Sequence, residues 1–152
     1  MNDRLSITLY ADRDGFISYE CPYCGSSFKL NASDISDASY PLEELFCPYC
    51  GLTDTPNRFL SSIAVEAIEN LVYNHTAKML NREFDNMAKE INRKRGVLRM
   101  QFKPIEMLPE KKTSDDDTPE GIFSCMACER SVKVHHNTGL SKLFCPFCGV
   151  SL

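Results

Sequence analysis

The sequence LFCPYCGL, residues 45–52, is repeated almost unchanged as LFCPFCGV at residues 143–150. The match extends upstream to Leu42 and Leu140, at the same offset of 98 residues. Two more Cys-x-x-Cys pairs precede these copies, so that four such pairs contain all eight cysteines of the 152-residue chain. The pairs are Cys21/Cys24, Cys47/Cys50, Cys125/Cys128 and Cys145/Cys148.

The arrangement of the cysteines predicts metal sites rather than disulfides. The sequence shows neither a signal peptide nor a run apolar enough to cross a bilayer, so we expect a cytoplasmic or other reducing compartment and no membrane association. Thiols stay free there unless a metal binds them. A Cys-x-x-Cys turn, or knuckle, directs two sulfurs toward one point, and two knuckles supply a tetrahedron. We therefore expect two structural zinc ions per chain, each closed by four cysteines.

Short strand patterns surround the knuckles. FISYE (16–20) and SSFKL (26–30) flank the first knuckle, and GIFS (121–124) and SVKVH (131–135) flank the third. The first module has 22 residues between its knuckles and the second has 16. The extra residues fall in the polar stretch NASDISDASY (31–40), which we interpret as an inserted loop.

These knuckles and strands resemble the zinc-ribbon superfamily, in which rubredoxin-like knuckles stand on a small antiparallel sheet. The resemblance covers residues 16–52 and 119–152, under half of the chain. It implies two zinc ribbons, but ribbons occur in transcription factors, ribosomal proteins, topoisomerases and docking adaptors alike. Met126 and Glu129 depart from the Pro and Gly of the other knuckles. Rubredoxin binds iron instead, which makes iron electron transfer a minor alternative.

Between the modules, apolar periodicity predicts a long helix over residues 56–95 that holds the two ribbons apart. Thr55 can cap the helix and Gly96 can end it, with a break near Asn74 or Asn81 as an alternative. Ribbons offer little surface to cover a helix of roughly 60 Å, so we expect a homodimer through this helix. Its predicted interface consists of Leu60, Ala64, Leu71, Leu80, Phe84, Met87 and Ile91.

The remaining patterns complete an α+β fold class. Residues 4–10 and 97–103 both alternate apolar and polar side chains, which favours a strand pair. The expected domains are 1–55 (N-terminal strand and first ribbon), 56–109 (helix and strand), 110–120 (mobile charged linker) and 121–152 (second ribbon).

The charge balance favours a protein partner over a polyanion. The net charge is −4, and each zinc bound by four thiolates adds −2, so the loaded protein is near −8. The exception is a local basic run, which could bind phosphates or could simply be a helix end and a solvated strand face. The candidate nucleic-acid contacts are Arg93, Lys94, Arg95, Arg99, Lys103 and Lys133.

No catalytic arrangement is visible in the sequence. His135-His136-Asn137 lies between two knuckles, as in HNH nucleases, but too few residues follow before Cys145 to form the required helix. We interpret this stretch as a hairpin turn. The sequence therefore predicts a non-enzymatic zinc-binding adaptor that docks onto protein partners, within a complex that processes nucleic acid. The alternative is direct DNA or RNA binding through the second ribbon and residues 93–103. Loss of one ligand, as in Cys47→Ser, is expected to unfold the first ribbon alone.

Overall fold

The structure is a computed structural model that describes residues 5–39, 41–94, 96, 98–110, 120–135 and 142–152. The α+β class predicted from the sequence is confirmed, with one long helix and small antiparallel sheets. The chain divides into two compact units. Unit 1 comprises Met1–Ile7 and Glu66–Lys112, and unit 2 comprises Thr8–Val65 and Thr113–Leu152. Among the described residues, no helix combines the length and apolar character that a membrane span requires.

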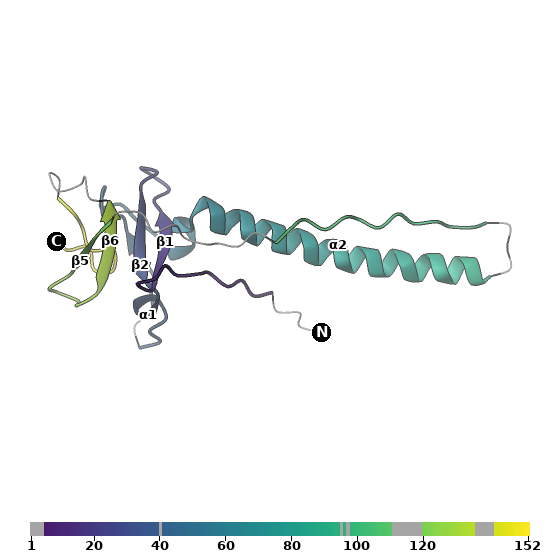
Figure 1. Cartoon of the computed structure of the whole chain (residues 1–152), viewed down its shortest axis with the longest axis horizontal. Helices are drawn as coiled ribbons and strands as arrows, with labels where there is room; N and C mark the ends of the chain where they lie inside the picture. Colours follow the sequence, from purple (N-terminus) through teal and green to yellow (C-terminus); the bar gives the residue numbers. More distant parts are fainter. Residues whose placement is uncertain (1–4, 40, 95, 97, 111–119, 136–141) are drawn as a thin grey trace. The chain divides into compact units, whose positions relative to one another are not determined.

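Unit 2 is built on a four-stranded antiparallel sheet in which two hairpins lie side by side (Figure 1). The strand order is β1 (Phe16–Glu20), β2 (Ser27–Asn31), β6 (Ser131–His135) and β5 (Glu120–Ser124). The sequence predicts strands on either side of the first and third knuckles; all four are present, and each pair forms an antiparallel hairpin. The pairing of β2 with β6, with Lys29 opposite Lys133 and Leu30 opposite Val132, joins them into one sheet.

The two sequence repeats pack against each other with approximate twofold symmetry. The N–H of Phe46 donates to the carbonyl of Pro146, and the N–H of Phe144 donates to the carbonyl of Pro48, both at 2.9 Å. Because Phe46 corresponds to Phe144 and Pro48 to Pro146, these bonds are the same contact made once from each copy. We call residues 16–54 module 1 and the described residues of 120–152 module 2. The expectation that the helix holds the ribbons apart is wrong, because the modules share a sheet.

One hydrophobic core serves both modules. Phe28 and Leu30 of β2 are fully buried beside Val132 and Val134 of β6. The ring of Phe59 meets the ring of Phe28 edge-on, with 6.0 Å between the centroids. The other buried members of the cluster are Tyr19, Cys21, Leu45, Cys47 and Leu143. The core therefore depends on side chains far apart in the sequence.

Two local predictions need correction around this core. The stretch 31–40, expected to be a loop, contains the helix α1 (Ala32–Ile35), whose first turn is capped by the Asn31 side chain, which accepts from the N–H of Ser33. The expected start of the long helix forms a 3-10 turn, η1 (Pro56–Phe59), instead. The long helix α2 (Ser62–Arg93) begins later, and the Ser61 hydroxyl accepts from the N–H of Ala64. Short strands β3 (Leu45–Phe46) and β4 (Thr53–Asp54) form a second sheet.

Unit 1 consists mainly of α2 and an extended segment, residues 98–110, that runs alongside it in the opposite direction (Figure 1). Three asparagines of α2 each form two hydrogen bonds with the main chain of this segment. In each case the side-chain amide donates to the carbonyl of one residue and accepts from the N–H of that same residue. Asn74 binds Leu108, Asn81 binds Ile105 and Asn92 binds Met100, at 2.8–2.9 Å. We call these side chains the asparagine ladder.

The predicted strand pair is not formed by the described residues of 4–10 and 97–103. The physical reason is that the asparagine ladder occupies main-chain groups that a neighbouring strand would need. The spacing fits: Asn81 to Asn92 rises about 16.5 Å along a helix, and five extended residues from Met100 to Ile105 cover about the same length. The predicted break at Asn74 or Asn81 is absent, since α2 is continuous through both.

The predicted domain boundaries stay a prediction. Most of the predicted linker, 111–119, and the predicted turn at Asn137 lie outside the described residues.

Candidate metal centres

The eight cysteines form two groups of four, with the membership that the repeat predicts. Cys21, Cys24, Cys47 and Cys50 make one group, and Cys125, Cys128, Cys145 and Cys148 make the other. Within each group all sulfur atoms lie within 4.8 Å of one another. Each group could therefore hold one metal ion.

The sulfur positions fit a tetrahedral ion. Four sulfurs at about 2.3 Å from a zinc ion stand about 3.8 Å apart at the corners of a tetrahedron. In module 1 the Sγ–Sγ distances are 3.8 Å for Cys21–Cys50 and 3.7 Å for Cys24–Cys47. In module 2 they are 3.6 Å and 3.5 Å, for Cys125–Cys148 and Cys128–Cys145. Four thiolate ligands complete the coordination sphere and leave no position for a substrate.

Each knuckle holds its sulfurs by the same backbone turn. The N–H four residues after the first cysteine donates to that cysteine's carbonyl, at 2.8–2.9 Å in all four knuckles. The residue at this position has a positive φ of about 60–70°, and it is Gly25, Gly51 or Gly149 in three of them. Glu129, with φ of 59°, occupies it in the fourth. A side chain in this conformation is strained, so the third knuckle is the irregular one, as its sequence suggests.

Hydrogen bonds also reach the sulfur atoms. The N–H of Tyr23 lies 3.4 Å from Cys21 Sγ, and the N–H groups of Tyr49 and Cys50 lie 3.4 and 3.5 Å from Cys47 Sγ. Such donors partly neutralise thiolate charge and fix its direction. They stabilise the ligating form of the cysteines.

The thiols differ in acidity within each group. Burial raises the pKa of Cys47 and Cys145 well above the usual thiol range. Burial also tends to raise the pKa of Cys24 and Cys125, but hydrogen bonds outweigh it and lower the pKa of each to about 7. Ser26 donates to Cys24. The N–H groups of Cys128 and Ala127 donate to Cys125. A metal ion would displace protons from the buried pair, so metal binding would release protons and weaken in acid.

Each centre is closed partly by the other module. A Cβ atom added to Gly51 would lie 3.2 Å from the ring of Phe144, and one added to Gly149 would lie 3.1 Å from the ring of Phe46. Phe144 of module 2 thus covers the Cys47/Cys50 knuckle of module 1, and Phe46 of module 1 covers the Cys145/Cys148 knuckle of module 2. Tyr49 adds a link, since its hydroxyl donates to the carbonyl of Ser27 and accepts from the N–H of His135.

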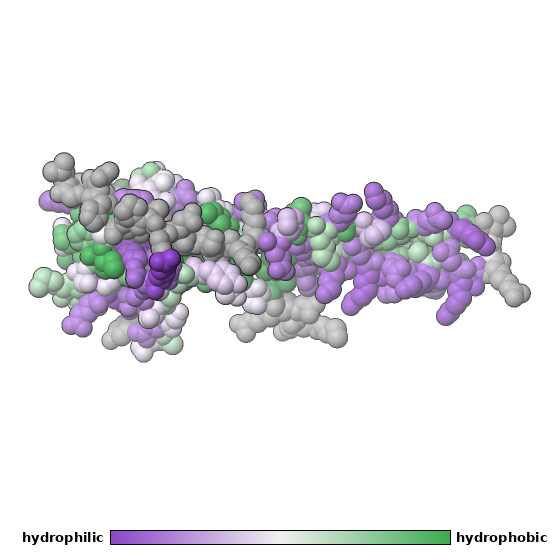
Figure 2. All heavy atoms as spheres, viewed as in Figure 1, coloured by the Kyte–Doolittle hydropathy of each residue, from purple (hydrophilic) through white to green (hydrophobic). Residues whose placement is uncertain are grey.

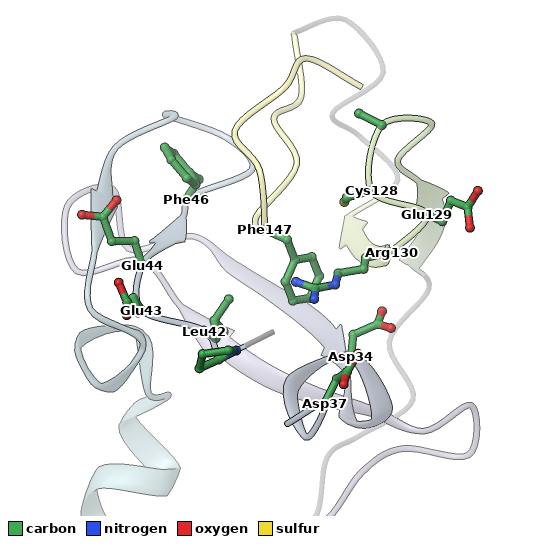
Figure 3. Close-up of a pocket in the computed structure, with 12 residues that line it drawn as sticks. Asp34, Asp37, Leu42, Glu43, Glu44, Phe46, Cys128, Glu129, Arg130 and Phe147 are labelled. Carbon is green, nitrogen blue, oxygen red and sulfur yellow. The ribbon is translucent and has the colours of Figure 1, made fainter. Parts of the chain in front are cut away.

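A groove of about 780 Å³ lies between the modules (Figure 3). Its apolar lining comes from Pro41, Leu42, Phe46, Ala127 and Phe147. Carboxylates line it from α1 and the residues after it, from the chain before β3 and from the third knuckle, namely Asp34, Asp37, Glu43, Glu44 and Glu129. The guanidinium of Arg130 lies over the ring of Phe147, 4.8 Å from its centroid. No sequence pattern predicts this groove, because it exists only where the modules meet.

Lys133, a predicted phosphate contact, is 6% exposed and bound inside unit 2. Its Nζ donates to Asp12 at 2.8 Å and to Asp14 at 2.6 Å, and Lys29 Nζ lies 3.6 Å from the same Asp12 carboxylate. Burial would raise the pKa of Asp12, but hydrogen bonds from Lys133 and from the N–H of Phe16 outweigh it, so this pKa is lowered. Lys133 is therefore removed from the candidate nucleic-acid surface.

The other candidate nucleic-acid contacts all belong to unit 1. Arg93, Lys94, Arg99 and Lys103 are exposed, and Lys94 Nζ lies 3.6 Å from Glu90. Arg95 lies outside the described residues. Because Asn92 binds both main-chain groups of Met100, the basic residues on either side of Gly96 are brought together.

The predicted dimer face of the helix is divided. Ala64 is buried, while Leu60, Leu71, Phe84 and Ile91 are half-buried. The ring of Phe84 packs on that of Phe102 in the extended segment, 5.1 Å between centroids. Leu80 and Met87 stay exposed, and Figure 2 shows hydrophobic residues lying among the more numerous hydrophilic ones on the visible face of unit 1. The chain's own segment thus covers part of the predicted interface, and self-association stays a prediction.

Comparisons with models of protein families, with curated proteins and with solved structures found no match. The structure itself therefore carries the functional argument. It shows two four-cysteine sites, each able to hold one metal ion, joined in a single pseudo-symmetric unit.

Proposed function

We propose that this protein is a non-enzymatic zinc-binding adaptor, and that the groove between its modules receives a basic segment of a protein partner. The observation that carries the docking role is the groove itself, which combines an apolar lining with five carboxylates and one guanidinium. Its volume of about 780 Å³ lies in the usual range of ligand sites, about 300–1,000 Å³. Zinc supplies rigidity rather than chemistry.

Zinc is the ion that we propose for both sites. Four thiolates at tetrahedral spacing suit zinc or iron. The zinc-ribbon resemblance and the closed coordination support a structural zinc ion at each site. A role inside a complex that processes nucleic acid is compatible with this assignment and forms part of the proposal.

The lining selects the chemistry of the partner. Asp34 accepts from the N–H of Ser131 and Asp37 accepts from the N–H of Ser39, so both carboxylates are held in place. Glu43 and Glu44 are exposed on the opposite side (Figure 3). Polyphosphate backbones are repelled by such a surface, whereas lysine or arginine side chains are attracted. An extended segment with alternating basic and apolar side chains would match both the carboxylates and Leu42 and Phe147.

The test uses two fluorescein-labelled ten-residue peptides, one of alternating Lys and Leu and one of alternating Glu and Leu. Fluorescence anisotropy with zinc-loaded protein should show tighter binding of the lysine peptide, weakening as salt rises. The double change Glu43→Gln and Glu44→Gln should raise its Kd about threefold to tenfold, from roughly 0.3–0.7 kcal/mol per charge. The control is Glu106→Gln with Glu110→Gln in unit 1. Equal binding of both peptides, or no effect of the groove variant, would contradict the docking role.

Direct nucleic-acid binding is the second candidate, supported by the exposed basic residues that Asn92 brings together in unit 1. Anisotropy of labelled single- and double-stranded DNA and RNA should then fall steeply with salt. A variant with Arg93, Lys94 and Arg95 changed to alanine should lose most of this binding, while Lys78→Ala, at an exposed position of α2 away from the basic run, should keep it. Absence of binding at low salt would remove this candidate.

A further inference from the structure

We propose that the two four-cysteine sites bind their metal ions cooperatively, as one coupled pair. The proposal starts from the contacts beside the ligands. Phe46 precedes Cys47 and donates its N–H to Pro146, which follows Cys145. The reciprocal bond, from Phe144 to Pro48, has the same length of 2.9 Å. Each of these knuckles is therefore held by main-chain groups of the other.

The aromatic rings couple the same knuckles a second time. The ring of Phe144 lies over Gly51 and the ring of Phe46 lies over Gly149, in contacts that leave little room for even a methyl group. A knuckle that loses its ion would release its turn, and the ring that it carries would no longer support the other knuckle. Metal binding at one site thus stabilises the geometry required at the other.

The shared core and sheet extend the coupling beyond the knuckles. Val132, Val134 and Leu143 of module 2 complete the cluster around Phe28 and Leu30 of module 1. Segments of fewer than 40 residues rarely build a stable core alone, and structural zinc commonly supplies much of their folding free energy. Unfolding of one module would expose the apolar side of the other. Coupling between ligand sites in proteins is typically about fivefold to 150-fold in affinity.

The test is native mass spectrometry of the metal-free protein during titration with Zn²⁺. Independent sites, equal or unequal, leave at least half of the molecules with one ion when half of the sites are filled. A tenfold coupling between equal sites lowers that fraction to about a quarter, and stronger coupling lowers it further. We expect mainly metal-free and doubly loaded molecules. A singly loaded fraction of one half or more would overturn the proposal.

Two variants locate the coupling. Phe144→Ala removes the ring over Gly51 and should raise the singly loaded fraction toward one half, whereas Phe102→Ala in unit 1 should leave it unchanged. The double change Cys145→Ser and Cys148→Ser should make the intact site bind zinc about tenfold to hundredfold more weakly than in the doubly loaded chain, measured by chelator competition. An unchanged affinity would contradict the proposal. On this proposal Cys47→Ser weakens zinc binding in module 2 as well, instead of affecting module 1 alone.

Discussion

Two lysines face each other across the centre of the sheet, and a single buried carboxylate makes this arrangement stable. Lys29 and Lys133 are 3% and 6% exposed, and the side chain of Asp12 is 1% exposed. Like charges at directly opposed strand positions repel. The pKa of Lys133 is raised because hydrogen bonds to Asp12 and Asp14 outweigh the opposing effect of burial.

Asp12→Asn should lower the free energy of unfolding by about 3–5 kcal/mol, because it removes the buried carboxylate that the Lys29 and Lys133 ammonium groups share. The Asp12 carboxylate stabilises the fold above its ordinary pKa of 3.8, and the contribution is lost as pH falls through the lowered folded-state pKa. Urea unfolding of zinc-loaded protein at pH 7 therefore reports the full effect. Asp14→Asn, at a side chain 62% exposed, should cost much less. Equal effects of the two changes would contradict the role given to Asp12.

The left-handed residue of the third knuckle offers a stabilising substitution. Glu129 has φ of 59°, where the other knuckles have glycine. Glu129→Gly should relieve backbone strain and stabilise the protein by about 0.5–1 kcal/mol, after the entropy that glycine adds to the unfolded chain. Thermal unfolding should show a higher Tm. The opposite change, Gly51→Ala, should lower the Tm, since it adds strain and crowds Phe144. A lower Tm for Glu129→Gly would contradict this reading of the turn.

At the scale of elements, the asparagine ladder explains how residues 98–110 stay extended although none of the described strands pairs with them. Asn81→Ala would remove both bonds to the main chain of Ile105, which is half-buried. The unpaired groups should cost about 1–3 kcal/mol locally. Hydrogen exchange at the Ile105 amide should accelerate by at least about tenfold. Asn86→Ala, at an exposed position of the same helix, is the control. Unchanged exchange at Ile105 would mean that the ladder does not hold the segment.

Elements with a strong local signal could be predicted from the sequence. The strands beside the knuckles and the body of α2 follow from short-range periodicity and turn residues. The alternation of Leu98, Met100 and Phe102 predicts a half-buried strand, whereas the structure has an unpaired extended segment among the described residues. Asn74, Asn81 and Asn92 carried the missing signal, since their positions share one face of a helix at intervals of seven and eleven residues. Considered one at a time, Asn74 and Asn81 indicate helix breaks instead.

At the scale of the whole molecule, the sequence repeat predicts the two cysteine groups but not the packing of their modules into one unit. The membership of each group follows from spacing, because two knuckles are needed to surround one ion. The pairing of β2 with β6 is a long-range contact between Lys29 and Lys133, and an alternating Phe-Lys-Leu pattern favours an exposed lysine. The shared core, the groove and the cross-covered knuckles all depend on that contact. The sequence repeat therefore indicates two similar modules, but it does not indicate that they pack against each other.

The most direct test of two closed zinc sites is zinc-edge X-ray absorption of the purified protein, combined with elemental analysis. We expect two zinc ions per chain, each with four sulfur neighbours at about 2.3 Å and no oxygen or nitrogen ligand. Such a result would establish both sites as structural. Iron in place of zinc, one ion per chain, or a first shell containing oxygen would contradict it.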